Sequence, residues 1–121
     1  MAERAAVDAD VFEELRADIG SDHACADFVE IFLDLLPGRL HDLTISLRQP
    51  TDPWEPAGNL AATCRMLGAF PLAEHLEQIR PDAPWLESAD CVRAHLSRTF
   101  DLAQLSRVEL RRQVVCLRRS A

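Results

Sequence analysis

The sequence predicts an all-α protein, an antiparallel four-helix bundle with up-down-up-down topology and a short extra helix at the N-terminus. Apolar residues recur at helical spacing along nearly the whole chain, and no segment sustains the strict alternation of a strand. Four amphipathic segments joined by short connections can bury their apolar stripes together in such a bundle. The length fits one domain, residues 1–121, in which residues 1–7 are expected to be a flexible N-terminus.

The first expected helix is short and runs from about Asp10 to Ile19. Asp10 can cap its N-terminus, Glu13 can complete a capping box, and Gly20 can stop the helix. The apolar residues expected to form its buried stripe, spaced three and four apart, are Phe12, Leu15 and Ile19.

A longer helix is expected from roughly His23 to Leu47, with Ser21 or Asp22 as its cap. Pro37 lies inside this segment and should kink the helix, because proline removes one backbone donor and clashes with the preceding turn. The apolar pattern resumes in phase after the proline, so we expect one kinked helix rather than two. Its buried stripe is expected to contain Phe28, Ile31, Phe32, Leu35, Leu36, Leu40, Leu43 and Leu47.

A turn is expected over residues 49–54. Within it, Asp52 can cap a third helix and Pro53 can occupy the first position of that helix. This helix is expected to extend to about Leu67, where Gly68 stops it. Its buried residues are expected to be Leu60, Cys64 and Leu67.

Pro71 is expected to open a short fourth helix, and residues 80–85 are expected to form a loop. The last helix should run from about Ser88 to Leu117. The inward residues of the fourth helix are expected to be Leu72, Leu76 and Ile79. The stripe of the last helix is expected to contain Val92, Leu96, Phe100, Ala103, Ser106, Leu110, Val114 and Leu117, with Leu102 and Leu105 to one side.

The composition excludes several classes of function. All 13 basic residues are arginine, so chemistry that needs lysine, such as a Schiff base or a phosphate-binding loop, is excluded. The net charge is −7, and residues 1–60 carry most of the acids, which disfavours binding to nucleic acid. The basic residues of the tail, read either as a solvated helix face or as a docking patch, are Arg107, Arg111, Arg112, Arg118 and Arg119.

Cofactor, metal and membrane sites are not expected. No apolar run reaches the length of a membrane span, and the first twenty residues are acidic rather than apolar. None of the four histidines is spaced for a zinc site, so no metal is expected. A cytoplasmic location with four free, mostly buried thiols follows from the wide spacing of Cys25, Cys64, Cys91 and Cys116.

The most informative segment is residues 58–69, which read GNLAATCRMLGA. This segment resembles the active helix of histidine-containing phosphotransfer (HPt) domains, which reads roughly H-x-L-K-G-x-x-x-x-L-G-A. Gly58 stands at the position of the phosphoacceptor histidine, Ala61 at that of the lysine and Ala62 at that of the glycine. The residues that match the structural positions of the family are Leu60, Leu67, Gly68 and Ala69.

Two further segments match the same family at the correct relative spacing. Residues 32–40 read FLDLLPGRL, like the F-L-x-x-L-P-x-R-L end of the preceding helix in HPt domains. Residues 72–79 read LAEHLEQI, like the L-A-x-x-L/C-x-x-L that follows the active helix. The resemblance covers roughly residues 8–80 and implies an HPt-like bundle.

The resemblance implies a module without phosphotransfer chemistry. Glycine has no side chain to accept a phosphoryl group, and alanine cannot replace the lysine that helps to neutralise its charge. We therefore expect a degenerate HPt domain that is not an enzyme. Such a domain would bind a response-regulator receiver domain or a histidine kinase. The expected docking residues, four of which share a helical stripe, are Gly58, Asn59, Ala61, Ala62 and Arg65.

Three other interpretations stay open at this point. The small residues of the stripe can line a tight helix contact or an idle surface. An active phosphotransfer protein can use a non-standard histidine, for which His75 is the nearest candidate, although a partly buried flank position suits His75 better. A helical-bundle adaptor outside phosphorelay can use its last helix, with Arg111 and Arg112, or a dimer face. Cys64, on the motif helix, is expected to be a buried thiol.

Overall fold

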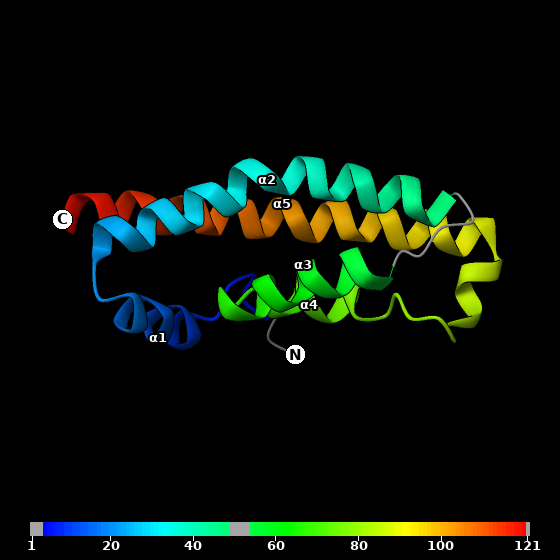
Figure 1. The fold of residues 1–121 in the computed structure, drawn as a ribbon, viewed down its shortest axis with the longest axis horizontal. Helices are drawn as coiled ribbons and strands as arrows, with labels where there is room; N and C mark the ends of the chain where they lie inside the picture. Colours follow the sequence, from blue (N-terminus) through cyan, green and yellow to red (C-terminus); the bar gives the residue numbers. More distant parts are fainter. Residues whose placement is uncertain (1–3, 49–53, 121) are drawn as a thin grey trace.

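The computed structural model describes residues 4–48 and 54–120 (Figure 1). These residues form helices and connecting segments, and no strand is found among them, so the predicted all-α class is confirmed. The elements are α1 (Ala9–Ile19), α2 (Asp22–Arg48), α3 (Trp54–Met66), α4 (Phe70–Leu76), the 3₁₀ turn η1 (Pro84–Glu87) and α5 (Ala89–Ser120).

Helices α2 and α5 are by far the longest elements and lie side by side along the molecule (Figure 1). Helix α2 runs toward the end where η1 lies, and α5 returns in the opposite direction. Helices α3 and α4 lie together along one side of this pair, and α1 lies near the start of α2. The core fills the space between these layers and includes Phe12, Leu36, Leu43, Leu60, Leu67, Leu72, Leu76 and Leu110.

The N-terminal cap of α1 differs from the prediction. Asp8, rather than Asp10, caps the helix, and its carboxylate accepts hydrogen bonds from the backbone of Asp10 (3.0 Å) and Val11 (3.1 Å). The capping box with Glu13 is therefore wrong, because Asp10 already belongs to the first helical turn. Gly20 ends α1 in the left-handed region (φ 78°), as predicted.

The segment before α1 is held against the body of the protein. Val7 is buried, and the Asp8 backbone N–H donates to the Gly68 carbonyl (2.8 Å). Arg4 forms an ion pair with Glu74. Of the stretch expected to be flexible, Arg4 thus contacts α4 and Val7 is buried, and residues 1–3 lie outside the described residues.

Helix α2 continues through Pro37 as one helix, and Ser21 caps it by accepting from the Ala24 N–H (3.2 Å). Its predicted buried stripe is wrong at two positions, since Ile31 is 60% and Leu35 is 49% exposed. The buried arc is rotated toward α5, the main neighbour of this helix, and places Val29 and Leu33 in the core instead. The predicted turn, with Asp52 and Pro53, lies outside the described residues.

Helix α5 extends beyond the predicted end, and Ser88 lies at its start, where the Ser88 hydroxyl accepts from the Cys91 N–H (3.3 Å). Phe100 was expected in the core but is 47% exposed, and Thr99 is buried in its place. Thr99 can lie there because its hydroxyl donates to the His95 carbonyl (2.8 Å), which satisfies the buried polar group. Ser106 is buried, as expected, and donates to the Leu102 carbonyl in the same way (2.9 Å).

Gly68, between α3 and α4, is required by the backbone. It lies in the left-handed region (φ 82°), as a helix C-terminal stop often does. A Cβ atom at this position would also lie 2.8 Å from the Asp8 carbonyl oxygen. Gly68 therefore allows the segment before α1 to pack closely against the end of α3. The inward positions predicted for the following segment, Leu72, Leu76 and Ile79, are all buried.

Candidate docking face on helix α3

The five predicted docking residues do not all lie on the surface. Gly58, Asn59, Ala62 and Arg65 are exposed on α3. Ala61 is only 1% exposed and packs in the core beside Leu60. Ala61 is buried because the core side of this short helix is wide enough to include two consecutive residues. The four exposed residues, Gly58, Asn59, Ala62 and Arg65, form the docking face.

Gly58 lies on the open side of α3. No heavy atom of the described residues comes within 4 Å of the place where a Cβ atom would be, apart from the backbone of the helix itself and the neighbouring residues. Its backbone is helical, with no positive φ. Neither packing nor backbone conformation therefore requires glycine at this position.

Arg65 is held by a carboxylate of its own chain. Its Nε and one terminal nitrogen donate to the two carboxylate oxygens of Glu77, each at 2.6 Å. These hydrogen bonds hold the pKa of the Glu77 carboxyl below its ordinary value. The pair is partly exposed, with 46% of the Arg65 side chain and 39% of the Glu77 side chain accessible. A partner that binds Arg65 must compete with Glu77.

An aromatic ring joins this pair to a second one. The guanidinium of Arg65 lies 5.7 Å from the centre of the Phe70 ring, and that of Arg4 lies 5.8 Å from the same ring. Both distances fit cation–π contacts. Because Arg4 is paired with Glu74 and Arg65 with Glu77, the two cations beside the ring are both neutralised.

Cys64 lies on the opposite side of α3 and is fully buried, as predicted. Burial raises the pKa of its thiol to about 12, so the reactive thiolate is scarce near neutral pH. Cys25 is buried as well, but Cys91 and Cys116 are exposed, so the expectation that most thiols are buried holds for only two of the four.

Two of the histidines are engaged in a stack that the sequence interpretation missed. The His75 and His95 rings stack at 3.7 Å, and Trp85 stacks on His95 at 4.2 Å. Each histidine Nε2 lies 2.9 Å from the backbone carbonyl of the other, so both donate from Nε2. His75 is partly buried, as expected. Its Nε2 is not free to accept a phosphoryl group.

The other two histidines lie on α2. His23 contacts Arg118, whose terminal nitrogen is 2.9 Å from the His23 Nδ1. The His23 Nε2 lies 3.6 Å from a carboxylate oxygen of Asp27. His41 is exposed. In the part of the chain that the structure describes, no group of three or more His, Cys, Asp or Glu side chains could hold a metal ion.

The basic tail is partly neutralised. Arg118 donates to the carboxylates of Asp27 (2.7 Å) and Glu30 (3.0 Å), which fastens the end of α5 to the start of α2. Arg112 pairs with Glu109 at 3.0 Å.

None of the helices formed by residues 4–48 and 54–120 has the length and apolar character needed to cross a membrane.

Comparison of the chain with protein-family models, with curated proteins and with solved structures gave no match. The docking face is an exposed helical surface with no nucleophile on it and one arginine at its edge.

Proposed function

We propose that this chain is an HPt-like module of a two-component phosphorelay that binds a receiver domain or a histidine kinase without accepting phosphate. In this proposal α2, α3, α4 and α5 are the four antiparallel helices of the bundle, α1 is the extra helix, and the module works in the cytoplasm. The observation that carries the proposal is the exposure of Gly58. The position that matches the family's histidine faces open space on α3.

Two further observations support a docking surface. Ala62 and Asn59 are exposed beside Gly58, so the surface is made of small side chains that a partner can approach closely. Arg65 lies at the edge of this surface and can offer its guanidinium to the acidic pocket of a receiver domain, once Glu77 is displaced. The buried Ala61 does not contribute to contact with a partner.

Calorimetric titration against a panel of receiver domains and histidine kinases tests the proposal. Ala62→Arg places bulk in the middle of the docking face and should abolish binding. Arg65→Glu should also abolish it, by opposing the acidic pocket with a negative charge. The double variant Arg65→Glu, Glu77→Arg is the matched control, because it restores the intramolecular pair with reversed charges and should still fail to bind. Absence of binding to every receiver and kinase of the source genome would refute the proposal.

A second function has one observation in its favour. Helix α5 carries four large apolar side chains that are about half exposed, Phe100, Leu105, Val108 and Val115. Such residues favour a helical-bundle adaptor that binds through its last helix. Pull-down and sedimentation with Arg111 and Arg112 replaced by glutamate, or with Val108→Asp, would separate this function from docking through α3.

A further inference from the structure

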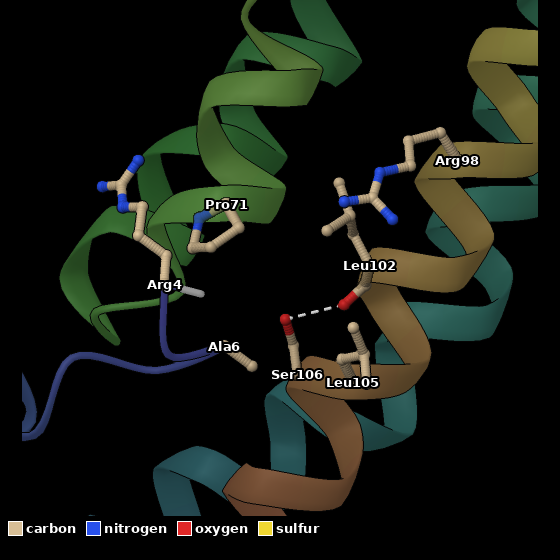
Figure 2. A pocket seen from close by; sticks show the side chains of 7 residues that line it. All are labelled: Arg4, Ala6, Pro71, Arg98, Leu102, Leu105 and Ser106. Atoms are coloured by element: carbon tan, nitrogen blue, oxygen red, sulfur yellow. Dashed lines mark hydrogen bonds between the residues drawn. The ribbon is translucent and has the colours of Figure 1, made fainter. Parts of the chain in front are cut away.

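A pocket of about 320 Å³ lies where the segment before α1 meets α4 and α5 (Figure 2). None of the residues that line it belongs to the docking face, and its assignment does not depend on the proposed function. Its apolar walls are formed by Ala6, Pro71, Leu102 and Leu105. Leu105 is 55% exposed and stands at the edge, whereas Leu102 is buried. The volume lies within the range of sites for small molecules.

The pocket carries one cation that the fold does not use. Arg98 is exposed, and its side chain makes no hydrogen bond or ion pair with any of the residues that the structure describes. Figure 2 shows its guanidinium extending toward the middle of the pocket. Arg4 also borders the pocket, but its guanidinium points away and is held by Glu74.

The remaining polar group of the pocket is the hydroxyl of Ser106. It donates its proton to the Leu102 carbonyl (2.9 Å), so toward a ligand it can only accept a hydrogen bond. The site therefore combines one guanidinium fork with an apolar surface. A guanidinium pairs with a carboxylate through two parallel hydrogen bonds, and the apolar walls can bury the body of the same molecule.

We propose that this pocket binds a small monocarboxylate with an apolar body, an aryl-alkyl or medium-chain acid. Arg98 holds the carboxylate, and Leu102, Leu105 and Pro71 cover the hydrocarbon part. A single free cation matches a monoanion, whereas a phosphate dianion would leave a charge uncompensated because Arg4 is already neutralised by Glu74. Since the pocket is built from three segments, the ligand should also fasten residues 4–7 to the helices.

The test is an NMR titration of the full chain with 4-phenylbutyrate and with its neutral analogue 4-phenylbutan-1-ol. The acid should shift the amide signals of Ala6, Leu102, Leu105 and Ser106. Arg98→Gln should weaken binding of the acid by about tenfold or more, the loss expected for a charge-assisted hydrogen bond, and leave the alcohol unaffected. Leu105→Ala should weaken binding of both compounds.

Arg111→Gln is the matched control, since it removes the same charge from the same helix but from a residue that does not line the pocket. It should leave both affinities unchanged. The proposal is overturned if the acid shifts no pocket signal, or if Arg98→Gln and Arg111→Gln weaken its binding equally. Both variants change exposed side chains, and equal thermal midpoints without ligand would show that the fold is intact.

Discussion

Gly58 occupies a helical position where glycine lowers stability, although neither packing nor backbone conformation requires glycine there. A Cβ atom there would meet no neighbour among the described residues, and the backbone is in the ordinary helical region. Gly68 is the opposite case, because its positive φ and its contact with the Asp8 backbone both require the absence of a side chain. The two glycines that bracket the motif thus have different physical reasons to be there.

This contrast gives a prediction at the residue scale. Gly58→Ala should raise the free energy of unfolding by about 0.5–1 kcal/mol, because alanine restricts the unfolded chain and has the higher helix propensity. Urea denaturation followed by circular dichroism measures the change. Gly68→Ala is the matched substitution and should destabilise the protein. A loss of stability in Gly58→Ala would mean that the open space beside Gly58 is filled in solution.

The start of α1 gives a prediction at the scale of the element. Asp8→Ala should lower the free energy of unfolding by about 1 kcal/mol, because two N–H groups of the first turn lose their acceptor. Asp10→Ala removes the same charge from the residue that the capping-box pattern favoured, and it should have little effect. Equal losses in the two variants would contradict the assignment of Asp8 as the cap. Chemical denaturation of both variants decides between them.

The stack of His75, His95 and Trp85 connects α4, η1 and α5, and it predicts how stability depends on pH. Burial, assisted by the neighbouring His75, lowers the pKa of His95 from its ordinary 6.5 to about 4. The unfolded chain therefore takes up a proton on His95 below pH 6.5 that the folded chain refuses. Stability should fall as the pH falls from 6.5 to 4, by at most about 3 kcal/mol from this residue.

His95→Phe is the variant that isolates this effect, because phenylalanine keeps a ring in the stack and binds no proton. The free energy of unfolding, measured by urea denaturation between pH 7 and pH 4.5, should decline less steeply in this variant than in the wild-type protein. Parallel pH profiles for the two proteins would show that His95 does not carry the dependence. Below that window the paired carboxylates of Asp22, Asp27 and Glu77, whose pKa values are lowered, lose their charge and contribute a further decline.

At the scale of the whole molecule, the sequence pattern was sufficient to predict the helices and part of the core. Leu60, Cys64 and Leu67 are buried as expected, because they recur at helical spacing on the side of this segment that faces the core. The buried faces of the long helices were harder to predict, since an apolar pattern does not indicate on which flank the neighbouring helix lies. For this reason Ile31 and Phe100 are exposed although they fit the period.

The candidate site was predictable only in part, and the reason is its dependence on contacts distant in the sequence. The exposure of Gly58 follows from the helical period. The ion pair of Arg65 with Glu77 depends on how α4 returns beside α3, which no local pattern encodes. The same is true of His75 and His95, which are twenty residues apart. Two sequence features indicate the stack of these histidines. Trp85 lies between them in the sequence, and His95 comes one residue before the stripe residue Leu96.

The arrangement of α3 in the whole molecule also changes how phosphate acceptance should be engineered. The family pattern suggests histidine at Gly58 and lysine at Ala61, but a lysine at the buried Ala61 would have to force its ammonium into the core. Ala62 is exposed one helical turn after Gly58, so a lysine there can reach the surface beside a new imidazole. We expect Gly58→His, Ala62→Lys to fold and, if the proposed function is right, to accept phosphate slowly from a phosphorylated receiver.

The measurement is the transfer of labelled phosphate from a phosphorylated receiver to this chain, with loss of the label in acid as the mark of a phosphohistidine. Gly58→Gln, Ala62→Lys is the matched control, because glutamine is similar in size to histidine and cannot be phosphorylated. The wild-type protein is assayed in parallel, since an acid-labile label on it would reveal a non-standard histidine acceptor. If the histidine variant binds the receiver and is well folded but takes up no label, α3 does not present Gly58 to the receiver as an HPt helix would.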